Sequence, residues 1–531
     1  MTNAFRIPDG SKKTYVPNPW VARNAFRAGA SSGDRPPAPD REVALGLLPE
    51  PFWSGGDREI AAYRGVWEFA LRNIRPATAE NGFAADYADT AFNNFTFLWD
   101  SAFITMFWRY GRAAWDAMGT LDNFYAKQHP DGFISRQISG VDGTDHFPRH
   151  DPSSTGPNVL AWAEWEWFRH TGDAERLARV FPALAGYTRW MRRNRTWPDG
   201  SYWATGWASG MDDQPRRADA FLESPPTRGD GFHVNFDHGH MAWVEACFQA
   251  LLANRLLVGM AGALGIGADA DEFREEAENL ASWCAANLWD ERTGFFHDRT
   301  RDGCLANHIK SVGAYWALLA GGVDAGRLPR FVAHLADPSE FDRPHRVPSM
   351  SADSRGYEMD GGYWRGAVWA PTTYMVLCGL SSVGEDALAH AIALNHLRNV
   401  AASYASTGTF FENYAPESFG DGRYRRDFVG WTGLSPTAVL FEFVFGLRPD
   451  PAARRLVWDV RLTDEHGVRR YPFGRSNTLD LLCRARPSVE SEPQVEIRSP
   501  TPVEVEIRWA GGKKIVSHAS PTIVKAKQIA E

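Results

Sequence analysis

Two short acidic stretches hold the side chains in this sequence that are best suited to chemistry. Asp212 lies within residues 207–213 and Glu412 lies within residues 410–417, 200 positions later, and each stretch also contains aromatic residues. Cleaving a glycosidic bond needs one carboxylic acid to protonate the leaving oxygen and one carboxylate on the other side of the sugar. Aromatic rings in turn cover the apolar C–H faces of sugars. The two stretches together therefore predict a carbohydrate-cleaving pocket.

The surroundings of Asp212 suit a general acid. Gly210, two positions earlier, permits a tight turn that points the carboxyl group into a cavity. Trp203 and Trp207 would desolvate this group, and desolvation favours the neutral, proton-donating form. Asp213 would raise its proton affinity further or bind a sugar hydroxyl. An ordinary Asp-rich turn is the alternative, and the local sequence alone favours that alternative.

Glu412 is the candidate general base. It follows two phenylalanines and precedes Asn413-Tyr414, in a predicted loop before a helix that begins near Trp431. A hydrogen-bonded, partly hydrated carboxylate at this place would stay ionised and could activate a water molecule. Glu417 is the rival base, and a simple turn or helix-end position for Glu412 is the structural alternative.

Three further stretches predict a sugar-binding wall, because they combine aromatic rings with Asp, Arg or Gln side chains. The stretch 361–369 has two glycines, three aromatic residues and an arginine directly before a predicted helix, and a purely structural account of it needs several coincidences. In another stretch, Asp100 lies beside Trp99 at a predicted helix start, where Asp is also a plain N-cap. The residues predicted to bind sugar are Trp99, Asp100, Phe133, Arg136, Trp207, Asp213, Tyr363, Trp364, Arg365 and Trp369.

Amphipathic segments, which must position these side chains, recur from about residue 57 and predict a mainly helical body. Gly172 fits a helix C-terminal cap, Asp173 a helix start and Pro371 a first helical turn. Long glycine-rich and aromatic loops alternate with short ones, so we expect an (α/α)6 toroid whose pocket is built from the long loops. A helical solenoid is the alternative, but no repeat of fixed length is visible. The predicted helices are 57–75, 97–118, 155–171, 173–194, 238–263, 268–289, 308–321, 366–381, 384–403 and 432–447.

The chain after about residue 450 has a different, β-type pattern. Residues 503–509 alternate with period two, and Gly511-Gly512 supplies a hairpin turn before Ile515-Val516. At the other end, the first 55 residues are rich in Pro, Gly and Arg and indicate an extended arm. Further strands are predicted at 456–462, 478–485 and 494–498. We expect three regions: an extended arm over 1–55, an (α/α)6 catalytic domain over 56–449 and a small β-sandwich over 450–531.

Composition and charge exclude several classes of partner. The 531 residues are 44% hydrophobic and 23% charged, as in an ordinary globular protein, and their net charge is −8. This balance gives no attraction to phosphate backbones or anionic lipids, so neither nucleic acid nor a membrane is expected as a partner. The 22 tryptophans are unusual for a core alone, because many lie beside charged residues and glycines.

No cofactor or metal is expected from the sequence. The five cysteines (Cys247, Cys284, Cys304, Cys378 and Cys483) have no CxxC spacing, and no phosphate-binding or dinucleotide motif is present. A structural Ca²⁺ among loop carboxylates remains open. The first twenty residues have no signal-like apolar run, and no later run is long enough to cross a bilayer, so a cytoplasmic location is expected. A homo-oligomer remains possible.

Six stretches of the chain, in order, resemble those of glycoside hydrolase family 63, which contains processing α-glucosidase I and mannosylglycerate hydrolases. They span 97 to about 447, most of the helical body, and six matches in order are fairly specific. The trehalases of family 37 are relatives of that family with the same fold. The matching stretches are Trp99-Asp100-Ser101, Gly132-Phe133-Ile134-Ser135-Arg136, Ser209-Gly210-Met211-Asp212-Asp213, Tyr363-Trp364-Arg365-Gly366, Glu412-Asn413-Tyr414 and Gly430-Trp431-Thr432.

The resemblance implies an (α/α)6 toroid and an inverting α-glycosidase, with Asp212 as general acid and Glu412 as general base. Signature trehalase stretches are absent, so we expect an exo-acting enzyme that releases a terminal α-linked hexose, glucose before mannose, from a small glycoside or oligosaccharide. The resemblance also places a group of residues around the non-reducing-end sugar: Trp99, Asp100, Trp364, Arg365 and Trp431.

The arginines of the long 196–237 loop have two possible roles. Arg216, Arg217 and Arg228 fit the recognition of an acidic aglycone such as glycerate. A solvated face is the simpler and favoured interpretation of the same residues.

Two other functions are compatible with the same predicted fold. A sugar epimerase or isomerase would work through histidine acid/base pairs, and His233, His238 and His240 form a local cluster. Loop histidines are more often surface or packing residues. A non-catalytic carbohydrate-binding protein is the third hypothesis, although the presence of both candidate acids counts against it.

Overall fold

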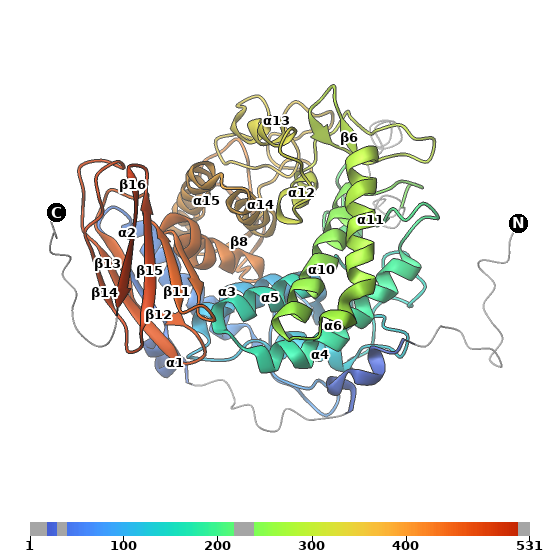
Figure 1. Cartoon of the computed structure of the whole chain (residues 1–531), viewed down its shortest axis with the longest axis horizontal. Coiled ribbons are helices and arrows are strands. Elements are labelled where there is room, and N and C mark those ends of the chain that lie inside the picture. Colours follow the sequence, from blue (N-terminus) through green and yellow to red (C-terminus); the bar gives the residue numbers. More distant parts are fainter. Residues whose placement is uncertain (1–17, 29–39, 217–237, 519–531) are drawn as a thin grey trace, which may run out of the picture.

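The computed structural model describes residues 18–28, 40–216 and 238–518. These residues form a mainly helical body, with two β-sheets packed on one side of it, at the left in Figure 1. The prediction of a mainly helical body is confirmed. Its longer helices are α2 (Asp57–Arg72), α3 (Leu98–Trp108), α5 (Leu160–Thr171), α6 (Ala174–Asn194), α10 (Val244–Ala263), α11 (Asp271–Asn287), α14 (Ala370–Ser382) and α15 (Asp386–Thr407).

Short helical segments and hairpins connect these helices, and some of them were not predicted. Short α-helices are α1 (Arg41–Leu47), α4 (Gly119–Ala126), α7 (Gly206–Ser209), α12 (Trp316–Leu319) and α13 (Leu328–Ala333). The 3-10 segments are η1 (Val21–Arg23), η2 (Ala25–Ala28), η3 (Arg109–Gly111), η4 (Gly267–Ala270), η5 (Val312–Tyr315), η6 (His334–Ala336) and η7 (Trp431–Leu434), and η8 (Ser435–Val444) is a π-helix. Small hairpins pair β2 (Ile74–Arg75) with β3 (Tyr87–Ala88), β4 (Phe95–Phe97) with β5 (Gln137–Ser139), β6 (Trp289–Asp290) with β7 (Phe295–Phe296), and β8 (Phe411–Tyr414) with β9 (Gly422–Arg426).

The predicted helix ends follow from local chemistry. Gly172 closes α5 in the left-handed conformation, with φ 69°, where a residue with a Cβ would be strained. The side chain of Asp173 accepts a hydrogen bond from the backbone N–H of Arg176, at 3.1 Å, and so caps α6. Pro371 lies in the first turn of α14, where its missing N–H leaves no helical bond unmade. All three predictions are confirmed.

Helix α10 corrects the prediction that no apolar run is long enough to cross a bilayer. Within the described residues it is the one helix whose length and composition would allow it to span a membrane. However, 61% of its most apolar window is buried inside the protein, where α10 packs against α5, α6 and α11. A buried core helix meets the same criteria of length and composition, which is the physical reason for the difference.

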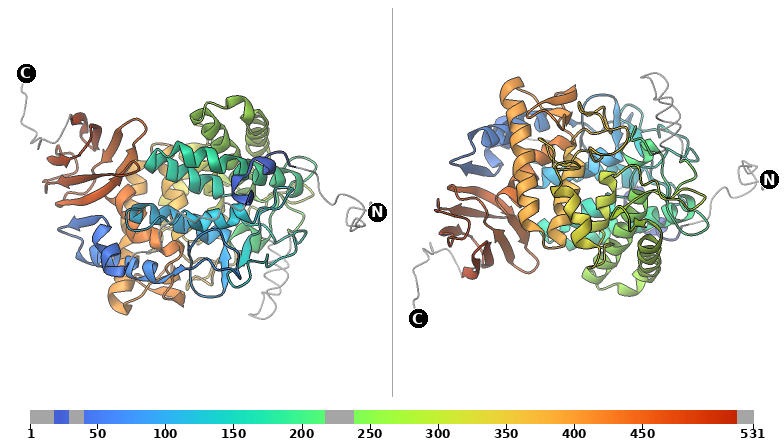
Figure 2. Two further views of the ribbon diagram at one scale, coloured as in Figure 1. Left: turned by 90° about the horizontal axis from the view of Figure 1, so that it is seen from below. Right: turned by 90° about the horizontal axis from the view of Figure 1, so that it is seen from above.

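The C-terminal region contains two four-stranded sheets, whose buried side chains join the core of the helical body. One sheet has the order β1-β12-β13-β14 and is antiparallel. The other has the order β10-β11-β15-β16 and includes one parallel pair, β11 with β15. Figure 2 shows these sheets beside the helices from two further directions. The strands are β1 (Glu50–Trp53), β10 (Leu447–Asp450), β11 (Arg455–Asp459), β12 (His466–Phe473), β13 (Asn477–Cys483), β14 (Val495–Arg498), β15 (Val503–Trp509) and β16 (Gly512–His518).

The chain before the helical body differs from the predicted extended arm over 1–55. Its described part from residue 40 onward forms α1 and then strand β1, which pairs with β12 more than 400 positions later. Pro51 is tolerated because β1 is the edge strand of its sheet. A four-residue strand that contains proline carries no readable alternation, so local sequence could not reveal this pairing.

A buried network of charged and hydroxyl groups ties four helical elements together. The guanidinium of Arg109, which is 1% exposed, forms an ion pair with Glu442 of η8. The hydroxyl of Tyr110 donates to Glu442 Oε1 at 2.6 Å, and that of Tyr374, on α14, donates to Oε2 at 3.0 Å. Glu166 of α5 lies 3.6 Å from Arg109. Because α3, α14 and η7–η8 also carry or adjoin the predicted site residues, this network holds the elements that position them.

Candidate active site

Asp212 lies directly after the short helix α7, on a turn that needs glycine. The Thr205 side chain caps α7 by accepting a hydrogen bond from the N–H of Ala208 at 3.2 Å. Gly210 then has φ 77°, and a Cβ at this position would lie 3.0 Å from the ring of Trp99. Both the left-handed backbone and the close approach of the indole require glycine. The predicted tight turn before Asp212 is therefore present, and it sets Asp212 beside the N-terminal end of α3.

The carboxyl group of Asp212 is held close to its neutral form. Burial raises its pKa to about 7, the nearby cation of Arg136 opposes this shift, and the carboxylates of Asp213 and Glu412 reinforce it. A carboxylic acid that keeps its proton near neutral pH can act as a proton donor. These are the electrostatics predicted for a general acid.

Glu412 lies on β8 and is 3% exposed, with partners that favour its ionised form. Burial raises the pKa of Glu412, but the Tyr363 hydroxyl, which donates to Oε1 at 2.8 Å, and the cation of Arg425, 3.4 Å from Oε2, both lower it. A carboxylate with one hydrogen bond and one adjacent cation is suited to accepting a proton. Burial thus raises the pKa of both carboxyl groups and a cation opposes the rise at each, but Glu412 also has a side-chain hydroxyl that lowers its pKa.

A third buried carboxyl group, that of Asp100, is affected by the charges of both candidates. Asp100, on α3, is 7% exposed, and its pKa is raised well above the usual range by burial and then by the negative charges of Glu412, Asp89 and Asp212. The pKa of the Tyr363 hydroxyl is likewise raised by burial, by Glu412 and by Asp212. The segments that carry these carboxyl groups also touch, because Gly210 lies against Trp99 and Asp213 accepts from the N–H of Trp364, so three separate parts of the chain meet here.

Three predicted sugar-binding tryptophans form a buried cluster, one member of which contacts Glu412. The rings of Trp364 and Trp369 lie parallel, with centroids 3.9 Å apart, and both side chains are almost fully buried. Trp431 packs edge-on against Trp369 with a centroid distance of 5.7 Å and donates from Nε1 to the carbonyl oxygen of Glu412 at 2.9 Å. In this structure these residues position the candidate base, and Trp364 and Trp369 present almost no surface to a ligand.

The loop before α14 is fixed by Asp213. Its carboxylate accepts a hydrogen bond from the backbone N–H of Trp364 at 2.8 Å and lies 3.4 Å from Arg365. Arg365 also pairs with Glu358 at 2.9 Å. Tyr363, in the middle of this loop, has φ 111°, a strained value for a residue with a Cβ. Such strain is often stored at functional sites, and here it belongs to the residue that holds Glu412.

Arg136 and Trp207 form one face beside Asp212. The Arg136 guanidinium lies 5.0 Å from the ring centre of Trp207 and donates to the carbonyl oxygen of Trp207 at 3.1 Å. Burial lowers the pKa of Arg136 to about 10, against the opposing effect of Asp212 and Asp100. Arg136 and Trp207, which were predicted separately to bind sugar, thus lie together.

The structure places Phe133 and Arg216 in the interior. Phe133 is fully buried and packs against Trp190, with ring centres 5.0 Å apart, so its ring has no exposed face for a sugar. Arg216 is buried in ion pairs with Glu245 at 2.5 Å and Asp298 at 2.8 Å. It is therefore neither a free anion-binding group nor part of a solvated face. The predictions for Arg217 and Arg228 lie outside the described residues.

The histidine cluster does not meet the candidate acids. His238 and His240 pack on each other and on Trp197, with ring centres 5.2 and 5.9 Å from that indole. His233 lies outside the described residues. Packing on indoles is the ordinary role that was the favoured alternative for these histidines.

The sequence did not predict the contact of Arg425 with Glu412, nor the ion pair that holds the rival base Glu417. Arg425 lies in a run of arginines on β9, opposite β8, which looks like a solvated loop when read alone. Glu417, the rival base, forms a two-point ion pair with Arg343 at 2.7 and 2.8 Å and accepts a hydrogen bond from Tyr357 at 2.7 Å. This pairing lowers the pKa of Glu417 and gives it a structural partner.

Among the described residues, no three His, Cys, Asp or Glu side chains gather to form a metal site.

Comparison with known proteins decides the family. Residues 93–432, more than half of the chain, match the family described as mannosylglycerate hydrolase MGH1-like glycoside hydrolase domain. The crystal structure of a family 63 mannosylglycerate hydrolase from Thermus thermophilus, in complex with glucose, superposes with a TM-score of 0.57 at 25% identity, over 70% of this chain and 98% of that one. The chain belongs to glycoside hydrolase family 63. The predicted resemblance is confirmed.

Two further proteins resemble this chain more distantly or over a smaller part of their length. A probable mannosyl-oligosaccharide glucosidase from Schizosaccharomyces pombe is 28% identical over 302 residues, which are 52% of this chain but 33% of that larger protein. Neutral trehalase from Saccharomyces cerevisiae superposes with a TM-score of 0.50 at 16% identity, over 80% of this chain and 86% of that one, and shares the fold alone. The family 63 match covers the region that contains all three site carboxyl groups.

Proposed function

We propose that this chain is an inverting, exo-acting α-glycosidase that hydrolyses a terminal α-linked hexose, glucose before mannose, on a closed (α/α)6 toroid. The observation that carries the proposal is the different set of partners around two buried carboxyl groups. Burial raises the pKa of both groups, to about 7 for Asp212, and at Glu412 the Tyr363 hydroxyl and the Arg425 cation oppose that rise. Pairs of carboxyl groups whose environments push their pKa values apart are typical of acid/base pairs in glycosidases.

In the proposed mechanism each carboxyl group makes one proton transfer. Asp212 protonates the glycosidic oxygen as the bond to the anomeric carbon breaks. Glu412 removes a proton from a water molecule that attacks the opposite face of the sugar, so the anomeric configuration inverts. Asp100, Arg365 and the indole of Trp99 are proposed to bind the terminal hexose. The two catalytic carboxyl groups should lie about 6.5–9.5 Å apart in a substrate complex, which leaves room for the water.

The leaving group is proposed to be small and acidic. The Thermus enzyme was crystallised with glucose and, separately, with D-glycerate. Arg216 is buried in ion pairs here, so another cation must meet an acidic aglycone. Arg136, the cation beside the candidate acid Asp212, is on the leaving-group side and is the described cation that fits this role. Glucosyl and mannosyl glycerate are therefore the first substrates to test.

A direct experiment separates this proposal from its alternatives. The purified chain is incubated with α-glucosides and α-mannosides, and the first product is followed by anomer-resolved NMR. Release of the β-anomer supports inversion, and release of the α-anomer would overturn the mechanism. An epimerase would give a new sugar without aglycone release, and a carbohydrate-binding protein would give affinity without turnover. The packing of His238 and His240 on Trp197 already weakens the support for an epimerase.

The rate of hydrolysis is expected to fall as the pH rises through about 7. The acid must carry its proton, and the pKa of Asp212 is raised to about 7 by burial. The alkaline limb of kcat/KM reports the acid in the free enzyme, and the acidic limb reports the base. The measurement is kcat/KM between about pH 4 and pH 9, the range in which both carboxyl groups titrate. A rate that stays constant from about pH 6 to pH 9 would rule out Asp212 as the acid.

Tyr363→Phe is expected to move the acidic limb of the same profile upward. Its hydroxyl donates to Glu412 and lowers the pKa of that carboxyl group. Loss of a hydrogen bond to a charged group, worth about 1.5–3 kcal/mol, corresponds to a shift of about 1–2 pH units. Tyr357→Phe is the matched control, because Tyr357 donates in the same way to Glu417 outside the site. An equal shift in both variants would contradict the assignment of Glu412 as the base.

A further inference from the structure

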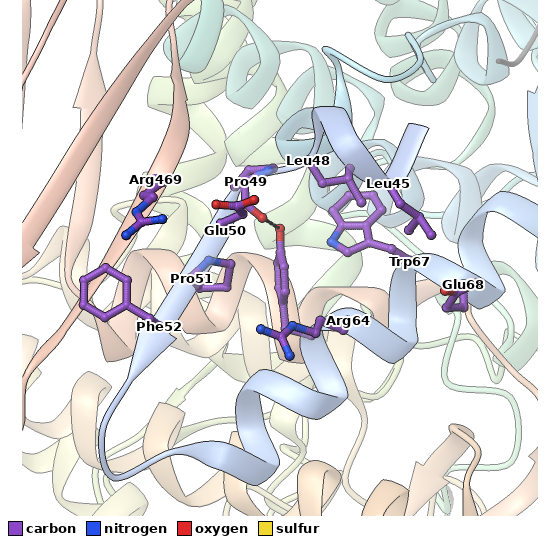
Figure 3. A pocket seen from close by; sticks show the side chains of 11 residues that line it. Leu45, Leu48, Pro49, Glu50, Pro51, Phe52, Arg64, Trp67, Glu68 and Arg469 are labelled. Carbon is purple, nitrogen blue, oxygen red and sulfur yellow. Dashed lines mark hydrogen bonds between the residues drawn. The ribbon is translucent and has the colours of Figure 1, made fainter. Parts of the chain in front are cut away.

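A separate cavity of about 490 Å³ lies between the helical body and the first strand of the C-terminal sheet. Figure 3 shows its walls, which come from α1, from β1, from α2 and from β12. None of its lining residues belongs to the candidate active site. The lining residues are Leu45, Leu48, Pro49, Glu50, Pro51, Phe52, Tyr63, Arg64, Trp67, Glu68 and Arg469.

The walls of this cavity are mostly apolar and well fixed. Leu45, Leu48, Pro51 and Phe52 supply aliphatic and aromatic surface from α1 and β1. On the side of α2, the hydroxyl of Tyr63 donates to the carbonyl oxygen of Pro49 at 2.8 Å, which fastens the helix to the chain just before β1. A cavity of this volume with apolar walls and a few polar groups has the dimensions of a small-molecule site.

The charged groups of the cavity do not balance. Glu50 pairs with Arg470 at 3.0 Å, and Glu68 pairs with Arg41, and neither of these two arginines lines the cavity. Arg64 and Arg469, which do line it, have no ion pair or side-chain hydrogen bond within the described part of the chain.

The cavity therefore presents two exposed cations that form no ion pair within the described residues, while its two carboxylates pair with arginines outside the lining. The buried indole of Trp67 completes this wall. Donors and cations surrounded by apolar surface attract a ligand that supplies both an anionic acceptor and an apolar body.

We propose that this cavity is a binding site for a small organic anion with an apolar body, such as an aryl or alkyl carboxylate, sulfonate or phosphate. Its apolar part lies on Phe52, Leu45 and Leu48, and its anionic group lies between Arg64 and Arg469, which are exposed and reach the ligand from the rim. Because β1 belongs to the C-terminal sheet and α2 to the helical body, the ligand fastens these two parts to each other. The proposal does not depend on the catalytic activity.

The test uses 8-anilinonaphthalene-1-sulfonate, which combines a sulfonate with two aromatic ring systems and becomes fluorescent in apolar sites. The full chain and the double variant Arg64→Gln/Arg469→Gln are titrated with it at fixed ionic strength. The variant is expected to raise the Kd about tenfold, the loss expected for two charge-assisted contacts at a partly exposed rim. The neutral analogue N-phenyl-1-naphthylamine should bind both proteins with equal affinity, because it lacks the anionic group.

The matched control is Arg58→Gln/Arg454→Gln, which removes the same charge from two exposed arginines that do not line the cavity. Its Kd for the sulfonate should stay within about twofold of the unmodified chain, since long-range attraction between exposed charges is screened by salt. If the Kd rose equally in both double variants, the change in net charge alone would explain it, and the proposal would be overturned. So would a Kd above about 1 mM for the unmodified chain, or an unchanged Kd in Arg64→Gln/Arg469→Gln.

Discussion

Asp212→Asn and Glu412→Gln are each expected to lower kcat on an unactivated α-glucoside by about a thousandfold or more. Each substitution keeps the shape of the side chain but removes its ability to donate or accept the proton. A positioned acid or base typically contributes 10²–10⁴ in rate, about 3–5 kcal/mol of barrier, and both groups act in the same transition state. The measurement is steady-state release of the hexose at a pH near 6, below the pKa of about 7 of Asp212.

The nature of the leaving group distinguishes the acid from the base. A glycosyl fluoride or a dinitrophenyl glycoside leaves without needing a proton, so Asp212→Asn should recover most of its rate on such substrates. Glu412→Gln should not recover, because the attacking water still lacks its base. Equal recovery in both variants, or recovery in Glu412→Gln alone, would contradict the assigned roles.

Two controls separate loss of chemistry from loss of folding. Glu417→Gln removes the rival carboxylate, which is paired with Arg343 and Tyr357, and is expected to retain turnover close to the unmodified enzyme. Asp212→Asn should be at least as stable as the unmodified chain at alkaline pH. The pKa of Asp212 is raised in the folded state, so its ionisation opposes folding as the pH rises through about 7, and an amide removes that cost.

Much of the fold was predictable because it follows from local patterns. The amphipathic period, the Gly172 cap and the Asp173 start place helices α5 and α6 within a few residues of their observed bounds. The pairing of β1 with β12 was not predictable, because it joins segments more than 400 positions apart and β1 is only four residues long. The π-helix η8 was predicted as an ordinary helix, since its apolar residues read the same with either hydrogen-bond spacing.

The candidate site was predictable in its carboxyl groups but less so in its aromatic residues. Asp212 and Glu412 follow glycine-rich or aromatic motifs, and the order of these motifs along the chain is that of the family. Sequence alone does not reveal which face of an aromatic ring is open, because that depends on partners far along the chain. Trp364 and Trp369 illustrate this, since they stack on each other at 3.9 Å and are almost fully buried. Phe133 likewise packs in the core.

Arg109→Met is expected to lower the free energy of unfolding by about 3–5 kcal/mol, the cost of leaving a buried carboxylate without its cation. Arg109 is 1% exposed and pairs with Glu442, whose other contacts are the hydroxyls of Tyr110 and Tyr374. Urea unfolding at about pH 8 measures the loss. Arg274→Met, which removes an exposed partner of Asp271, is the matched control and should cost less than about 1 kcal/mol.

The pH dependence of this loss identifies its cause. Without Arg109, the buried carboxylate of Glu442 would have no cation beside it, and its charge would oppose folding. The deficit of Arg109→Met should therefore be full at alkaline pH and shrink as the pH falls toward about 4. Arg109→Met/Glu442→Gln should regain part of the stability, because an amide can keep the Tyr110 and Tyr374 contacts without a charge. A loss that does not change with pH, or a double variant no more stable than Arg109→Met, would mean that packing rather than the buried charge pair holds α3, α14 and η8 together.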